Sequence, residues 1–153
     1  MRLLRTAVVL ALAALLAACA SSTTDKDAAA IVTALAEQGL PVKLSVAYDE
    51  STDPNHLLGR PNGYTSKAAF TDSRIDASQV ARDKGDVGLG GGVEVFDDAG
   101  TAEKRAEYIK AVATAPMLAE YTYIAGNVVV RVSKHITPTD AKAFEDALAK
   151  IVQ

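Results

Sequence analysis

The chain has 153 residues, of which 49% are apolar and 23% charged, proportions that fit one globular domain and exclude wholesale disorder. Its formal charge of -3 argues against nucleic acid as a partner and against a broad electrostatic hold on anionic lipid, because both need clustered Lys and Arg. The single cysteine excludes a disulfide within the chain, and the absence of Trp weakens the case for a platform that stacks bases or sugars.

The first part of the chain has the pattern of an export signal. Met1–Arg5 carries two positive charges, and the apolar run Thr6–Ala18 is too short for a membrane span, which needs about 20 apolar residues. Small residues then precede Cys19, as a signal peptidase requires. Residues 1–18 are therefore predicted to be a signal peptide. An ordinary signal with an incidental cysteine, or an uncleaved helix, are the alternatives.

The segment Leu16-Ala17-Ala18-Cys19 resembles the lipobox of bacterial lipoproteins. The resemblance implies cleavage before Cys19, diacylglycerol on its sulfur and further acylation with chains such as palmitate. Two or three acyl chains hold a protein stably on a membrane, whereas one holds it only marginally. We therefore expect a lipid-anchored protein on the extracytoplasmic face of the cell membrane. Because such a chain folds after export, we expect no cofactor loaded in the cytosol.

Residues 19–27 are small, polar and rich in Ser and Thr, and they predict a lipidated, flexible tether. Neither a second linker nor an internal repeat follows, so residues 28–153 are expected to form one domain. Helical spacing of apolar residues predicts helices over residues 28–38, 98–114 and from 137 onward. Asp27 and Thr137 are suitable N-caps, Asp97-Asp98 is explained by capping, and Pro138 suits a first helical position.

Alternating apolar residues and flanking turns predict five strands, over residues 42–48, 66–75, 87–97, 121–125 and 128–133. Gly126-Asn127 is a strong hairpin signal between the last two strands. Residues 76–86 predict a turn or a short helix. The order α-β-β-β-α-β-β-α predicts an α+β fold, with a mostly antiparallel sheet of about five strands and helices packed on one face.

Several segments have a superficial likeness to catalytic or ligand sites. The glycines of residues 88–92 open a strand rather than a helix, so a backbone bend or bulge is expected instead of a phosphate loop. The two histidines, His56 and His135, are too few for zinc, and no serine lies in a nucleophile-elbow context. The charges of residues 103–107, Arg105 among them, are expected to form a solvated helix face. We therefore expect no metal site and no catalytic residue.

The segment from Asp53 to Lys67 is similar to a stretch found in small lipoproteins of high-GC Gram-positive (actinobacterial) bacteria. The segments Gly92–Phe96 and Gly126–Val132 look similar to the same group. The resemblance covers most of the domain, and it implies a location outside a single cytoplasmic membrane but no activity.

The same segment contains the candidate binding residues of the domain. Its prolines stiffen it, Gly59 and Gly63 permit unusual backbone angles, and Leu57 and Leu58 can pin it to the core. An outward polar patch could then form, with Arg60 beside Tyr64 suited to a carboxylate or phosphate. The candidate residues are Asp53, Asn55, His56, Arg60, Tyr64 and Lys67. The alternative is that Arg60 pairs with Asp53 or a carbonyl and only holds the loop shut.

Together these features predict a non-enzymatic, membrane-anchored domain that binds an envelope protein or a small ligand. A cell-wall hydrolase or lipid-modifying enzyme is the first alternative, and it would need a nucleophile paired with a base. A carrier of a hydrophobic ligand is the second, and it would need a cavity between the sheet and the helices.

Overall fold

The computed structural model describes residues 22–80 and 83–153. The predicted signal peptide and Cys19 lie outside these described residues, so the lipid anchor stays a prediction. Within the described ranges, every helix is too short or too polar to cross a membrane.

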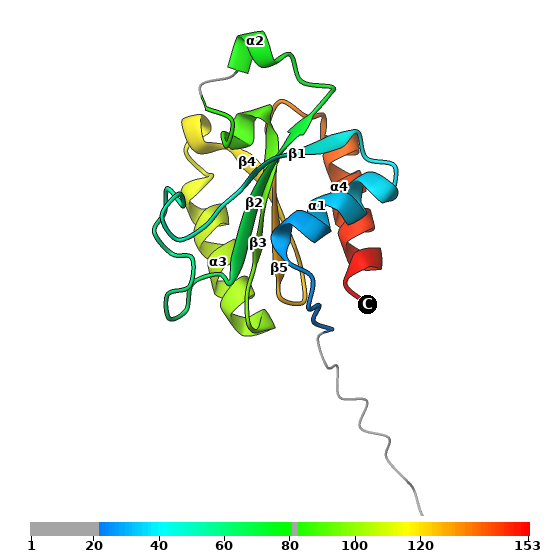
Figure 1. Ribbon diagram of the computed structural model, residues 1–153. Helices are drawn as coiled ribbons and strands as arrows, with labels where there is room; N and C mark the ends of the chain where they lie inside the picture. The colour runs from blue at the N-terminus through cyan, green and yellow to red at the C-terminus, as the bar shows by residue number, and fades with distance from the viewer. Residues whose placement is uncertain (1–21, 81–82) are drawn as a thin grey trace, which may run out of the picture.

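A five-stranded antiparallel sheet forms the centre of the domain (Figure 1). Its strands lie in the order β1-β2-β3-β5-β4, so β1 and β4 are the edges. The strands are β1 (Val42–Ala47), β2 (Ser66–Asp72), β3 (Gly90–Val95), β4 (Glu120–Ala125) and β5 (Val128–Ser133). The α+β class, the five antiparallel strands and the predicted order of the elements are confirmed.

The helices begin at the residues that the sequence marks as caps. They are α1 (Ala28–Glu37), α2 (Ala77–Val80), α3 (Ala99–Val112) and α4 (Pro138–Ile151), with 3-10 turns η1 (Val87–Leu89) and η2 (Pro116–Leu118). Oxygens of Asp27, Asp98 and Thr137 accept the backbone N–H of Ala30, Thr101 and Asp140. The short α2 lies inside the segment expected to be a turn or a short helix.

The helices cover both faces of the sheet rather than the single face expected. One face packs against α1 and α4 through alternate strand residues such as Val128, Val130 and Val132. The opposite face packs against α3, where Val129 and Phe96 meet the apolar stripe of that helix. Figure 1 shows α3 on one side of the sheet and α1 with α4 on the other. Three consecutive valines in β5 are the sequence signal of a strand buried on both faces.

The glycines of β3 do not form the expected bend or bulge. Gly90, Gly91 and Gly92 pair in register with β2, and the irregularity of the sheet lies in β1, between Leu44 and Val46. A Cβ on Gly91 would stand 2.4 Å from the ring of Phe70, so the glycine makes room for that ring. The glycine run serves core packing.

The described part of the predicted tether lies against the domain. The Asn127 side chain accepts the N–H of Thr24 at 2.9 Å and donates to its carbonyl at 3.0 Å. Ser22 lies so close to Gly126 that a Cβ on Gly126 would clash with the carbonyl oxygen of Ser22. The β4–β5 turn therefore holds the chain at Ser22 and Thr24.

Candidate functional site

The loop between β1 and β2 is organised around one buried carboxylate. Asp53 is 0% exposed and accepts hydrogen bonds from the Tyr64 hydroxyl at 2.6 Å and from Lys67 Nζ at 2.7 Å. The backbone N–H groups of Leu57 and Leu58 donate to its second oxygen at 2.8 and 3.1 Å. A buried carboxylate needs such a full set of donors, because an unpaired one costs several kcal/mol.

These contacts set the ionisation of the pair at the centre of the loop. Burial alone would raise the pKa of Asp53, but hydrogen bonds from Lys67, Tyr64 and backbone N–H groups hold it well below its usual range. Burial and the adjacent Asp53 carboxylate raise the pKa of the Tyr64 hydroxyl. Asp53 is therefore an anion and Tyr64 a neutral donor, which fits a structural clamp.

The loop residues do not form the predicted outward patch. Tyr64 is 0% exposed and packs edge-on against Phe96 in the core beneath α3. Arg60 is exposed, and Lys67 rather than Arg60 pairs with Asp53, so neither alternative for Arg60 describes the structure. Asn55 donates to the Tyr64 hydroxyl at 3.3 Å. His56 is exposed, with the positive φ of a turn residue.

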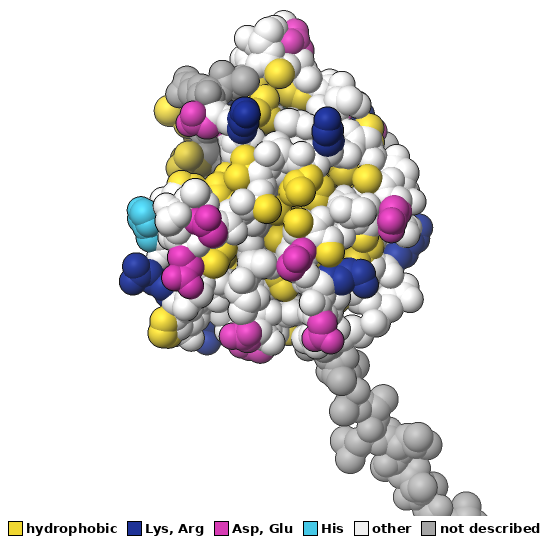
Figure 2. Space-filling view, in the orientation of Figure 1, with side chains coloured by type: hydrophobic (Ala, Val, Ile, Leu, Met, Phe, Trp, Pro, Cys, Tyr) yellow, Lys and Arg dark blue, Asp and Glu magenta, His cyan; other side chains and the backbone are white. Residues whose placement is uncertain are grey.

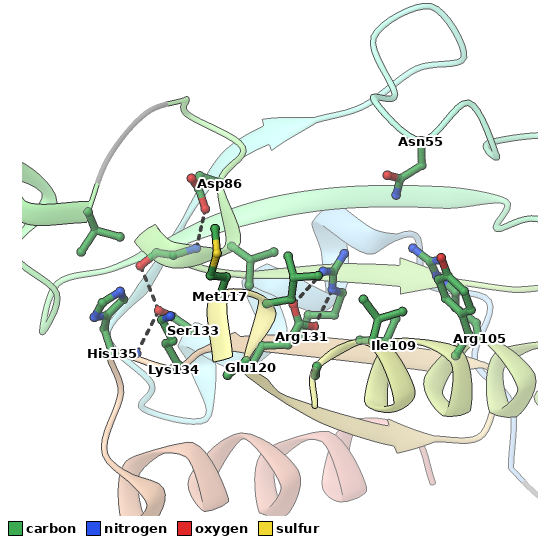
Figure 3. Close-up of a pocket in the computed structure, with 18 of the residues that line it drawn as sticks. Asn55, Asp86, Arg105, Ile109, Met117, Glu120, Arg131, Ser133, Lys134 and His135 are labelled. Carbon is green, nitrogen blue, oxygen red and sulfur yellow. Dashed lines mark hydrogen bonds and ion pairs between the residues drawn. The ribbon is translucent and has the colours of Figure 1, made fainter. Parts of the chain in front are cut away.

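A cleft of about 850 Å³ lies beside this loop, on the sheet face that α3 covers only in part. Its walls come from α3 and η2 on one side, and from Asn55 and the η1 segment on the other. The close-up in Figure 3 shows the side chains of Arg131 and Glu120 between these walls. A volume of this size falls in the range of about 300–1,000 Å³ that is usual for small-molecule sites.

One wall of the cleft ends in an apolar rim. Met117 is 89% exposed, Tyr108 61% and Leu118 54%, and Val112 is also exposed. These four residues all line the cleft, and Leu44 is the other large apolar side chain that is exposed in the described ranges. On the face of the molecule seen in Figure 2, charged side chains of both signs are interspersed around apolar atoms. Four exposed apolar side chains at one cleft are typical of a binding site.

The base of the cleft is formed by Arg105, Glu120 and Arg131, with Glu94 buried beneath them. These two Glu and two Arg residues are called the ionic floor. Glu94 is almost fully buried and accepts two hydrogen bonds from Arg105, at 2.7 and 2.9 Å. Glu120 accepts two from Arg131, both at 2.7 Å. Arg131 Nη1 also lies 3.7 Å from Glu94, so the two pairs join into one network.

Each arginine of the ionic floor stays charged. Burial alone would lower the pKa of Arg105, but its hydrogen bonds and charge interaction with Glu94 raise it above the usual value. The pKa of Arg131 is raised in the same way by Glu120 and Glu94, against the effect of burial. The floor therefore places two fixed positive charges and two negative ones beneath the cleft.

At the polar end of the cleft, the described residues do not include a nucleophile paired with a base. Ser133 Oγ donates to the carbonyl of Gly88 at 2.9 Å and accepts the backbone N–H of His135 at 3.2 Å. The His135 imidazole forms no hydrogen bond or ion pair with any residue in the described ranges. In the same ranges, His, Cys, Asp and Glu side chains do not gather in groups of three or more that could hold a metal ion.

No family model, curated protein or solved structure matches the chain. The cleft must therefore be interpreted from its own geometry. Of the candidate residues predicted from the sequence, Asn55 lines the cleft, whereas the apolar rim and the ionic floor were not predicted. Arg105 was expected on a solvated face, yet its side chain is only 15% exposed and pairs with Glu94. The signal that could have found the floor is Glu94 itself, a charge between two core valines.

Proposed function

We propose that this protein is a lipid-anchored, extracytoplasmic lipoprotein whose domain binds a small amphipathic ligand in the cleft between α3, η2 and the sheet. The single observation that carries the binding role is the gathering of exposed apolar side chains above a charged floor. The signal-like residues 1–18 and Cys19 carry the anchoring role.

Ligand binding fits the geometry better than the alternatives considered from the sequence. A hydrolase needs a nucleophile within hydrogen-bond reach of a base, and Ser133 uses both of its hydrogen bonds for the backbone. A carrier for a wholly apolar ligand is less suitable, because the floor of the cleft is charged. A ligand with one polar and one apolar end matches both surfaces.

The binding role can be tested with the neutral apolar dye N-phenyl-1-naphthylamine. We expect saturable fluorescence enhancement with the wild-type protein. The double variant Met117→Glu plus Leu118→Glu should lose it, because two charges then replace the apolar rim. Leu44→Glu changes an exposed apolar residue on β1 and should bind normally. A dye signal that does not saturate, or that survives the double change, would refute the cleft as the site.

The anchoring role has a separate test. Metabolic labelling with radioactive palmitate should mark the wild-type protein and should be absent from Cys19→Ser. The variant should also leave the membrane fraction. Label that persists after the substitution would disprove lipidation at this residue.

A further inference from the structure

Among the donors of the cleft, one nitrogen on each arginine of the ionic floor has no hydrogen-bond partner. Arg105 uses Nε and Nη2 for Glu94, and Arg131 uses Nε and Nη2 for Glu120. In residues 22–80 and 83–153, neither Nη1 forms a hydrogen bond, and Arg131 Nη1 approaches Glu94 only to 3.7 Å.

Both nitrogens are accessible from the cleft. In the described part of the chain, the buried side-chain nitrogen and oxygen atoms without a hydrogen-bond partner are Ser45 Oγ and Thr122 Oγ1. The two Nη1 atoms also lack a partner but are not among these buried atoms, so each has exposed surface. Arg105 and Arg131 line the cleft, with side chains 15% and 22% exposed. Each Nη1 carries two N–H groups, so the floor offers up to four charge-assisted donors.

The two guanidinium groups are close enough to act on one ligand group. Arg105 Nη2 and Arg131 Nη1 lie 2.9 and 3.7 Å from the same oxygen of Glu94. Their Nε edges are held by carboxylates, which fixes the direction of both planes before a ligand arrives. An acceptor above Glu94 can therefore meet donors from both residues.

We propose that the ligand is a single-chain acyl carboxylate, whose head binds Arg105 and Arg131 and whose hydrocarbon chain lies on the apolar rim. This rests on the proposed function and assigns it a ligand class. A hydrogen bond in which one group is ionised is about twice as strong as one between neutral groups, and between a guanidinium and a carboxylate both groups are ionised. The rim begins one turn along α3 from Arg105, at Tyr108, so head and chain sites are continuous.

The charge balance of the floor favours a monoanion over a phosphate dianion. Glu94 and Glu120 already neutralise the two arginines, so each added negative charge is repelled by two nearby carboxylates. A peptide is also a weaker fit. The rim comes from α3 and η2, whose backbone groups bond within those turns, so it offers apolar contact but few partners for a peptide backbone.

Displacement of the bound dye by defined probes tests the ligand class. With the full-length protein, we expect dodecanoate to displace the dye at a concentration at least tenfold lower than dodecanol, because the alcohol lacks the carboxylate. Dodecyl phosphate and a short apolar peptide with a free C-terminus should both be weaker than dodecanoate. Equal potency of dodecanoate and dodecanol, or tighter binding of the phosphate or the peptide, would overturn the proposal.

Two conservative variants test whether the carboxylate of the ligand binds Arg105 and Arg131, and both keep the ion pairs of the floor. Arg105→Lys and Arg131→Lys keep a cation beside each glutamate but lose the outer N–H groups. Each should weaken dodecanoate about tenfold and weaken dodecanol and the dye much less, because these two lack the carboxylate. Arg74→Lys is the matched control, since Arg74 pairs with Asp72 and Asp140 and does not line the cleft. Unchanged dodecanoate binding in both floor variants would refute the head-group site.

The two proposals can fail separately. If the dye binds in the cleft but dodecanoate shows no preference, the ligand class is wrong and the binding role stands. If the dye does not bind in a saturable way, the binding role itself fails. Folding of each variant is checked by its urea unfolding curve, so that a loss of binding is not confused with a loss of structure.

Discussion

At the scale of single residues, Asp53 determines the shape of the longest irregular segment. Its carboxylate accepts hydrogen bonds from the Tyr64 hydroxyl, Lys67 Nζ and three backbone N–H groups, so the loop closes over the core as one unit. The loop then positions Asn55 and Leu57 at the wall of the cleft. The segment that the sequence marked as a binding surface thus also supports one wall of the cleft.

Removing the cation that pairs with Asp53 should lower the unfolding free energy of the protein. In Lys67→Met, Asp53 stays buried without its ion pair, a change that typically destabilises a protein by about 3–5 kcal/mol. The remaining donors compensate in part, so we expect about 3 kcal/mol less unfolding free energy in urea. Lys43→Met on β1 is the control, because Lys43 is exposed, and it should stay within about 0.5 kcal/mol. Similar small losses in both variants would argue against the clamp.

The lowered pKa of Asp53 also predicts acid sensitivity. An unfolded chain takes up a proton on this carboxyl near its ordinary pKa of about 3.9, whereas the folded one does so only at lower pH. The stabilisation is therefore complete above about pH 5 and is lost as the pH falls toward the folded value. Unfolding free energy measured from pH 6 to pH 3 should fall more steeply for the wild type than for Asp53→Asn. Parallel curves would contradict this origin of the acid sensitivity.

At the scale of elements, the sequence predicts the features that depend on residues close together in the chain. The sequence predicts Asp27, Asp98 and Thr137 as caps because each contacts a residue only three positions away. The ionic floor could not be predicted in this way, since Arg105 and Glu94 are brought together by the packing of α3 on β3. The second apolar face of the sheet was not predicted either, because it also forms by the packing of α3 on the sheet. Val129, an apolar residue of β5 on that face, is the feature of the sequence that indicates it.

The glycines of β3 allow a matched test of packing. A Cβ on Gly91 would lie 2.1 Å from the Arg131 carbonyl oxygen and 2.4 Å from the Phe70 ring, whereas the nearest atom for Gly92 is 3.4 Å away. Because neither the backbone nor a core ring can move cheaply, Gly91→Ala should lower the unfolding free energy by about 3 kcal/mol. Gly92→Ala should change it by less than about 0.5 kcal/mol. Equal effects in thermal or urea unfolding would show that the glycine run is not a packing device.

At the scale of the whole molecule, the two faces of the sheet have different roles. The face beneath α1 and α4 holds the larger apolar core, including the stacked rings of Phe70 and Phe144. The other face is covered by α3 over only part of its area, and the uncovered part is the base of the cleft. A stable core on one side thus leaves the other side free to carry charged residues that would destabilise a closed interior.

The attachment of the chain to the β4–β5 turn limits how far the domain can stand from its proposed anchor. From Cys19 to Thr24 the chain can reach at most about 18 Å, at about 3.6 Å per residue. Asn127 holds Thr24 by two hydrogen bonds, so the turn would lie within this reach of the proposed lipid. The anchor would then restrict the orientation of the domain as well as its location.

Thr24→Pro should release this contact, because proline has no N–H to donate to Asn127. A net contribution of about 1 kcal/mol for the bond corresponds to about fivefold more frequent opening of the segment. Trypsin cleavage after Lys26 should therefore become about fivefold faster, while the urea midpoint of the domain changes little. Thr23→Pro is the matched control, since Thr23 is exposed and forms no hydrogen bond with the described residues. If both variants are cleaved at the wild-type rate, the contact with Asn127 does not restrain the chain, and the anchor would leave the domain free to rotate.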